Sequence, residues 1–300
     1  MVGKITASRV VFNVINYIVL GILAIACLYP FWYIFIYSLS DPVQARSGVT
    51  FWFKGFSLSN FEKVIQLNGI GMSLFISVAR TVIGTVASVF ACSFMGYLFS
   101  KNQMPCRKFL YRMLVITMYV SGGLIPTYLT ISAYHLTNTF WVYILPGVVS
   151  AYNIILVKTF VEQLPGSLEE SAILDGAGFF TIYSRIILPL SKPIVATIAT
   201  FTAVGQWNSY MDNYLYVNES SLNTLQYLLY KFLNSTQELT KLLQQGDTSA
   251  IHQMGTASQT LTPIGVRMTI TVITVIPIFL VYPFMQKYFA KGIMLGAVKG

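Results

Sequence analysis

The sequence predicts an all-α integral membrane protein with six transmembrane helices and both termini in the cytoplasm. Of its 300 residues, 55% are hydrophobic and only 10% are charged, and the mean hydropathy is +0.65. A soluble domain carries about a quarter charged residues, so this chain has too few charges to cover a surface that faces water. Intrinsic disorder, a disulfide-stapled secreted fold and a nucleic-acid-binding domain fit this composition poorly.

Six apolar windows are long enough to cross a bilayer, which requires about 20 residues. They cover approximately residues 12–37, 72–99, 110–131, 141–160, 194–217 and 267–289. The first follows Lys4 and Arg9 and is too long for the apolar part of a signal peptide, so we interpret it as an uncleaved span. In the third, Gly122, Gly123 and Pro126 predict a break or kink near the outer half.

The distribution of charge along the chain predicts the orientation. Twelve of the 19 basic residues and four of the 10 acidic residues lie in or beside the segments 1–11, 100–109, 161–193 and 290–300. Six basic and six acidic residues lie on the other side, and Arg80 lies within the second span. Short basic loops face the cytoplasm, so the net charge of +9 indicates topology and requires no nucleic-acid partner.

The cytoplasmic segment 161–193 holds all four inner acidic residues. Pro165 is expected to open a helix and Ser167 to cap it, with Glu170 completing a capping box. Gly176 and Gly178 are expected to end this helix. A second amphipathic helix is expected over about 179–188, where a proline follows and stops it. The two helices would form a rigid unit that a cytoplasmic partner can bind.

The segment resembles a known sequence motif. Glu170-Ser171-Ala172, then three residues, Gly176, nine residues and Ile186-Ile187-Leu188-Pro189 resembles the EAA loop of ABC-importer permeases, with Ser171 where alanine is usual. The tail 291–300 resembles the C-terminus of the maltose-type branch of these permeases, and the stretches 121–128 and 150–155 resemble its complex-oligosaccharide subgroup. The resemblance covers nearly the whole chain and implies the type I ABC importer permease fold as a single domain.

The resemblance also implies a function and partners. The chain is expected to be the permease subunit of a bacterial ATP-driven importer in the cell membrane, with an oligosaccharide as substrate. Implied partners are a second homologous permease, two ATPase subunits and an extracytoplasmic sugar-binding protein, which the outer segment 218–266 would contact. The implied ATPase-coupling residues are Glu169, Glu170, Ser171, Ala172, Asp175, Gly176, Ile186, Leu188 and Pro189.

Several chemistries are unsupported by the residues. No G-x-x-x-x-G-K-[ST] phosphate loop occurs, so the chain is expected to bind no cofactor and not to be an enzyme, with ATP and Mg²⁺ used by the partner ATPase subunits. His135 and His252 are far apart and lack a surrounding Cys, His or acidic cluster, so no metal site is expected. Within the outer segment, helical spacing over 225–243 predicts a short amphipathic helix.

The fifth apolar window carries neutral polar and aromatic side chains. In a continuous helix Gln206, Ser209, Tyr210 and Asn213 share one face, with Trp207 on an adjoining face. Amides and rings together suit a sugar, although helix packing and an interfacial aromatic belt explain the same pattern. The expected substrate pathway comprises Tyr119, Gly123, Tyr128, Asn153, Gln206, Trp207, Asn208, Tyr210 and Asn213.

Two alternatives to a sugar importer stay open. One is an ABC permease for a solute that is not a sugar, and the other is an ion-coupled secondary transporter. The latter needs ionisable residues within several spans, and Arg80 and Asp212 are the candidates. For Arg80 we expect snorkelling from a span boundary or pairing with a partner subunit rather than a place in the pathway.

Overall fold

The computed structural model describes residues 7–48, 51–66, 69–244 and 263–297, and the regular elements in these ranges are helices. The chain divides into two compact units, residues 1–67 with 231–275 and residues 68–230 with 276–300. Within these ranges, three helices are long and apolar enough to cross a membrane, or up to five if each of two bent helix pairs is one span. The all-helical class is therefore confirmed, and the count of six spans stays a prediction. Lys4, His252 and the tail end 298–300 lie outside the described residues.

The first unit is built on α1 (Ala7–Ser38), whose side chains from residue 9 to 32 are exposed and mostly apolar. A helix that exposes apolar side chains all round is suited to lipid or to another subunit. Past α1, η1 (Gln44–Ser47) and α2 (Ser59–Gln66) close over its C-terminal end. The buried Asn60 amide donates to the carbonyls of Ser38 (3.2 Å) and Ser40 (2.9 Å), which ties α2 to α1.

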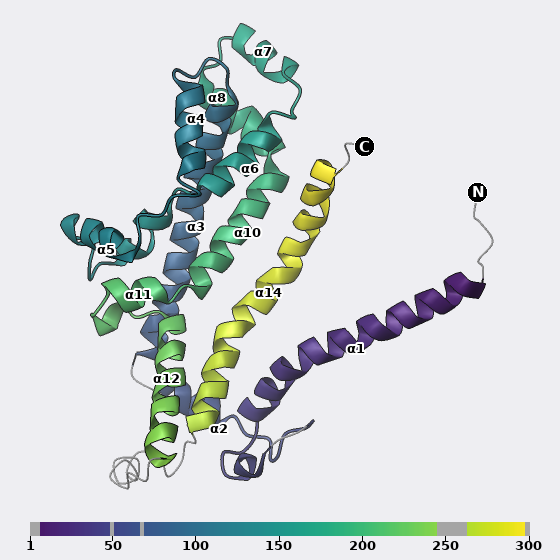
Figure 1. Cartoon of the computed structure of the whole chain (residues 1–300), viewed down its shortest axis with the longest axis vertical. Coiled ribbons are helices and arrows are strands. Elements are labelled where there is room, and N and C mark those ends of the chain that lie inside the picture. Colours follow the sequence, from purple (N-terminus) through teal and green to yellow (C-terminus); the bar gives the residue numbers. More distant parts are fainter. Residues whose placement is uncertain (1–6, 49–50, 67–68, 245–262, 298–300) are drawn as a thin grey trace. The chain divides into compact units, whose positions relative to one another are not determined.

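The second unit is organised around α3 (Ile70–Ser100), which packs against α6 (Ala151–Val161) and α10 (Lys192–Asn208) (Figure 1). A row of small residues at every fourth position, Gly84, Ser88, Cys92 and Gly96, is buried on α3. Small residues at this spacing let helix backbones approach closely. A Cβ on Gly96 would lie 2.7 Å from the Val157 side chain on α6. The row therefore sets how closely α6 and α10 can pack on α3.

Three of the predicted apolar windows contain broken helices. The window 110–131 holds α4 (Arg107–Ile116) and α5 (Leu124–Ala133), and the break at Gly123, with φ +83°, confirms the predicted interruption. The window 141–160 holds η2 (Phe140–Tyr143), η3 (Leu145–Gly147) and α6, with a 47° bend. In the window 194–217, α10 ends at Asn208 and α11 (Met211–Tyr216) begins after an extended Ser209. The prediction of one continuous fifth helix is therefore wrong.

The segment 161–193 forms two helical arms. The first, α7 (Ser167–Leu174), ends as predicted at Gly176, with φ +79°. The Gly176 and Ala177 amides donate to the carbonyls of Ile173 (3.0 Å) and Ala172 (2.9 Å), the Schellman pattern. The predicted capping box does not form, because Ser167 is the first helical residue and Gly166 holds the capping position without a side-chain bond. The helix starts one residue earlier than the sequence pattern indicates.

The second arm comprises α8 (Phe179–Ile182), the π-helical turn η4 (Tyr183–Ile187) and α9 (Leu188–Leu190). Pro189 was expected to stop the helix, but helical structure continues to Leu190 before an 84° bend into α10. A π turn widens the helix and moves the preceding carbonyls relative to the proline ring. Pro189 is therefore accommodated in the last turn of this arm.

The remaining helices of the described ranges are η5 (Ser220–Leu222), α12 (Leu225–Gln244) and α14 (Pro263–Ala297). Both α12 and α14 have residues in both units. The amphipathic helix predicted over 225–243 is thus confirmed as α12. Residues 245–262 of the predicted outer segment lie outside the described ranges.

The close packing of α3 leads to a testable prediction about stability. Gly96→Ala places a methyl group against Val157 and the Ile154 carbonyl, and overpacking of this kind costs about 1–3 kcal/mol. We expect a lower thermal unfolding midpoint for the detergent-purified protein. Gly71→Ala is the control, because a Cβ there meets nothing within 4 Å. Equal midpoints for the two variants would contradict the packing argument.

Candidate functional site

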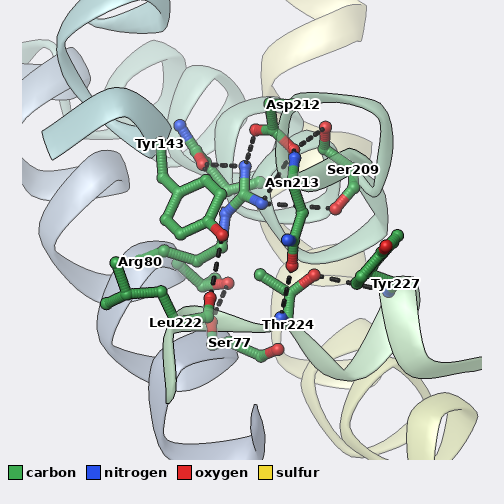
Figure 2. Close-up of polar contacts among 11 residues, drawn as sticks. Ser77, Arg80, Tyr143, Ser209, Asp212, Asn213, Leu222, Thr224 and Tyr227 are labelled. Carbon is green, nitrogen blue, oxygen red and sulfur yellow. Dashed lines mark hydrogen bonds and ion pairs between the residues drawn. The ribbon is translucent and has the colours of Figure 1, made fainter. Parts of the chain in front are cut away.

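Arg80 on α3 is the centre of a buried polar network, at 2% exposure (Figure 2). Its guanidinium forms an ion pair with Asp212, with Nη2–Oδ2 at 2.5 Å and Nη1–Oδ1 at 3.2 Å. It also donates to Gln206 Oε1 from Nε (3.2 Å) and Nη2 (3.0 Å) and to the Ser209 carbonyl from Nη1 (3.2 Å). The guanidinium carbon lies 4.5 Å from the centroid of the Tyr143 ring. The expectation that Arg80 snorkels or pairs with a partner subunit is wrong, because its partners lie within this chain.

The break between α10 and α11 is what gives Arg80 these partners. Where α10 ends, the Ser209 carbonyl can no longer accept a helical hydrogen bond, and a buried orphan carbonyl is costly in an apolar medium. Arg80 satisfies it. The Asp212 carboxylate is satisfied in turn by Arg80, by the Ser209 hydroxyl (3.0 Å) and by the Asn213 amide (2.9 Å). The charges and the break therefore stabilise one another.

A cavity of about 640 Å³ lies beside this network. Its lining combines aromatic rings with neutral hydrogen-bonding groups. The rings are those of Tyr143, Tyr152, Phe201 and Tyr216, and the polar neutral side chains are those of Ser88, Thr127, Ser150, Asn153, Thr202, Gln206 and Ser209. The two charged residues in the lining are Arg80 and Asp212, which neutralise each other. The wall offers hydrogen bonds and stacking surfaces without net charge.

Three of the predicted pathway residues lie in or against this cavity. Asn153 and Gln206 line it, and the Asn153 amide donates to Thr202 Oγ1 at 3.3 Å. Tyr128 stacks on the lining residue Tyr216, with ring centroids 5.9 Å apart. The structure therefore brings together residues from α5, α6, α10 and α11 that are far apart in the sequence.

The other predicted pathway residues lie elsewhere. Trp207 and Asn213 are buried outside the cavity lining, and Asn208 and Tyr210 contact α12. Tyr119 and Gly123 are exposed and lie between α4 and α5. The prediction of a single face failed because it assumed one continuous helix, and the break at residues 209–210 gives α11 a different direction.

Asn213 has an architectural role in the structure. Its side chain accepts from the Thr224 amide (2.6 Å) and donates to Asn223 Oδ1 (3.2 Å). Next to Thr224, the backbone amide of Leu225 donates to Ser77 Oγ on α3 at 2.8 Å. These contacts hold the start of α12 against α3 and α11 (Figure 2).

Several residues of the cavity lining are not indicated by any sequence pattern, among them Ser88, Tyr143, Phe201 and Thr202. The available signal was weak, since isolated rings and hydroxyls in apolar windows are common packing residues. The Arg80–Asp212 pair had a stronger signal, namely one basic and one acidic residue within apolar windows.

The acidic residues of the segment 161–193 differ in whether they form ion pairs within the chain. Glu169 pairs with Lys101, and Glu162 pairs with Arg107 (2.7 Å) and Lys158 (2.8 Å). The Glu170 carboxylate is exposed and forms no hydrogen bond or ion pair with the described residues. Leu174, at the end of α7, is 88% exposed. An unpaired carboxylate beside an exposed leucine is a suitable contact surface for another protein.

The other predicted coupling residues also divide into two groups. Ala172 is buried in a hydrophobic cluster, and Ile186 and Leu188 pack against it. Ser171, Asp175, Gly176 and Pro189 are exposed. The first group holds the two arms together, and the second group is accessible. Among the described residues, no group of three or more His, Cys, Asp or Glu is placed to hold a metal ion.

Comparison with known proteins identifies the family. No family model matches the sequence. The chain is 38% identical over 294 residues to the polygalacturonan/rhamnogalacturonan transport system permease protein YtcP of Bacillus subtilis (strain 168), covering 96% of this chain and 98% of YtcP. It is 37% identical to protein LplC of the same organism, covering 98% and 97%. A crystal structure of a bacterial ABC transporter involved in the import of the acidic polysaccharide alginate matches with a TM-score of 0.81 and 27% identity, covering 95% of this chain and 98% of that one.

The chain belongs to the family of ABC-importer permeases. The permease is a membrane protein and a transport subunit rather than an enzyme, and ATP hydrolysis takes place in a separate subunit. Importers of this family also use a substrate-binding protein. In the permease, α3 connects the two sites: Arg80 lines the cavity, and Lys101, 21 residues or about 30 Å of helix further on, pairs with Glu169 of the segment that carries Glu170.

The buried ion pair gives a prediction about the stability of the permease. Asp212→Asn leaves the Arg80 charge buried without a counter-charge, which costs about 3–5 kcal/mol. We expect a much lower unfolding midpoint in detergent, measured by thermal denaturation. Glu219→Gln is the control, because that carboxylate is exposed.

A double replacement tests whether the charge is the cause. Arg80→Met combined with Asp212→Leu removes both charges and is expected to recover part of the stability. An unchanged midpoint for Asp212→Asn, or a double variant as unstable as the single one, would contradict the assignment.

Proposed function

We propose that the permease translocates an oligosaccharide across the bacterial cell membrane in an importer driven by ATP. The observation that carries this proposal is the chemistry of the cavity. Four aromatic rings and neutral hydroxyl and amide groups line this space of about 640 Å³. Sugar hydroxyls require hydrogen bonds, and the C–H faces of sugars pack on rings. The relatives named for polygalacturonan, rhamnogalacturonan and alginate support an oligosaccharide as the substrate.

The proposed topology has six spans with both termini in the cytoplasm. The segment 161–193 is cytoplasmic, and the segment 218–266 faces the substrate-binding protein. The assembly contains a second homologous permease and two ATPase subunits, which use ATP and Mg²⁺, and this chain binds no cofactor. The excess of basic residues beside segments 1–11, 100–109, 161–193 and 290–300 supports this orientation.

Coupling to ATP hydrolysis is proposed to occur through α7. Glu170 and Leu174 offer an exposed carboxylate and an exposed apolar side chain to a cleft in the ATPase subunit. The Lys101–Glu169 pair and the packing of Ala172 fix α7 to the end of α3. Movement of the ATPase subunits would then displace the two arms as a rigid body and change access to the cavity.

Transport in proteoliposomes tests the proposal. The complete importer is reconstituted with its binding protein on one side and ATP on the side of the ATPase subunits, and uptake of oligosaccharides from polygalacturonan or rhamnogalacturonan is measured. Uptake that depends on ATP is expected. Uptake driven by a proton or sodium gradient without ATP would favour a secondary transporter, and ATP-dependent uptake of only non-sugar solutes would favour a different substrate class.

Charge reversal at the proposed coupling contact is expected to uncouple transport. Glu170→Lys places a like charge against a basic partner group, and we expect uptake to fall by about tenfold or more while the subunits still co-purify. Glu62→Lys, the same charge change on the exposed surface of α2, is the control and is expected to transport normally. Normal uptake by Glu170→Lys would overturn the coupling assignment.

Loss of a ring in the cavity is expected to weaken substrate handling. Tyr152→Leu removes a lining ring whose centroid lies 6.4 Å from that of Phe201. The loss of one stacking contact with the sugar corresponds to about a two- to tenfold change in the half-saturating concentration for uptake. Tyr134→Leu, at an exposed position outside this lining, serves as the control. Identical uptake curves would exclude Tyr152 from the pathway.

A further inference from the structure

Four tyrosines gather apart from the cavity: Tyr210 just before α11, Tyr214 on α11, and Tyr227 and Tyr230 on α12. Ser209, Asp212 and Tyr216 line the cavity, whereas Tyr210 and Tyr214 are absent from its lining and contact tyrosines of α12. A six-residue helix is about 9 Å long. The tyrosines and the cavity are therefore neighbours that share one short helix.

The rings of this group pack on one another. Tyr210 and Tyr230 are stacked, with centroids 4.6 Å apart and planes 19° apart. Tyr214 meets the Tyr230 ring edge-on at 5.8 Å and the Tyr227 ring at 6.5 Å. Tyr214 is nevertheless 53% exposed. A supported ring with a large open surface is suited to stacking with a ligand.

Two amides lie on the same pair of segments. Gln226 Nε2 donates to Asn208 Oδ1 at 3.0 Å, and Asn208 is exposed. A carboxamide has two donor hydrogens and two acceptor sites, so this pair retains hydrogen-bonding capacity toward a ligand. The six side chains carry no charge. We define the tyrosine cluster as Asn208, Tyr210, Tyr214, Gln226, Tyr227 and Tyr230.

The backbone under the cluster is held in place before any ligand arrives. The first turn of α12 is tied to α11 and α3 through Thr224 to Asn213 and Leu225 to Ser77. An aromatic belt at a membrane interface needs only separate rings that face lipid. Rings that are packed together, beside a hydrogen-bonded amide pair and on a backbone anchored in this way, instead form a preorganised surface.

We propose that the tyrosine cluster is a second carbohydrate-contacting site, at which a pyranose ring of the oligosaccharide stacks on Tyr214 before the sugar enters the cavity. The inference rests on the proposed function. The ligand class follows from the chemistry, since neutral amides beside an open aromatic face match the hydroxyls and C–H faces of a sugar. The cluster contributes to capture of the sugar and not to ATP hydrolysis.

The test compares three replacements in the reconstituted importer with its binding protein. Tyr214→Phe keeps the ring, and Tyr214→Leu removes it while remaining apolar. Tyr17→Leu, at a 74% exposed position on α1, controls for loss of an exposed aromatic ring. Uptake of a galacturonate oligosaccharide is measured as a function of concentration, together with basal ATPase activity and co-purification of the subunits.

The expected result is an about three- to tenfold higher half-saturating concentration for Tyr214→Leu, with Tyr214→Phe and Tyr17→Leu close to the unaltered importer. Maximal uptake and basal ATPase activity should not change. If Tyr214→Leu fails to assemble, Tyr214→Met replaces it, and the same shift is expected.

Two results would overturn the inference alone. One is an unchanged half-saturating concentration for Tyr214→Leu or Tyr214→Met, and the other is an equal shift for Tyr214→Phe, which would mean that the ring is not the contact. Absence of oligosaccharide uptake by the unaltered importer would instead overturn the proposed function, and this inference with it.

Discussion

The ion pair between Arg80 and Asp212 determines much of the second unit. Charges and orphan backbone groups are costly in apolar surroundings unless they are satisfied within the protein. Arg80 meets this requirement for Asp212, for Gln206 and for the carbonyl that the end of α10 leaves free. The direction of α11 after the break depends on these contacts. The cavity wall and the tyrosine cluster both depend on α11, so one buried guanidinium supports both surfaces.

The helix that carries Arg80 also relates the two candidate sites. The row of small residues on α3 allows α6 and α10 to lie close to it, and both of those helices contribute cavity residues. The far end of α3 meets α7 through Lys101 and Glu169. A tightly packed helix transmits displacement as a rigid element. The packing of α3 therefore gives a physical route between the coupling segment and the cavity.

Within the coupling segment, neighbouring residues of the same chemistry have different roles. Glu162 forms ion pairs with Arg107 and Lys158, and Glu169 forms one with Lys101. These ion pairs stabilise the fold of the segment. Glu170 stands next to Glu169 in the sequence but has no such partner among the described residues. On a helix, adjacent residues point about 100° apart, so one of the two acids faces the body of the protein while the other is exposed.

The sequence alone determined the all-helical membrane class, the interruption at Gly123 and the end of α7 at Gly176, because hydropathy and glycine conformation act locally. Only the tertiary structure decided the partners of Arg80, the break between α10 and α11, and the continuation of helical structure through Pro189 to Leu190. Helical periodicity places residues on faces only while the helix is continuous. Arg80 and Asp212 are 132 residues apart, and no local pattern indicates that two such distant charges satisfy each other.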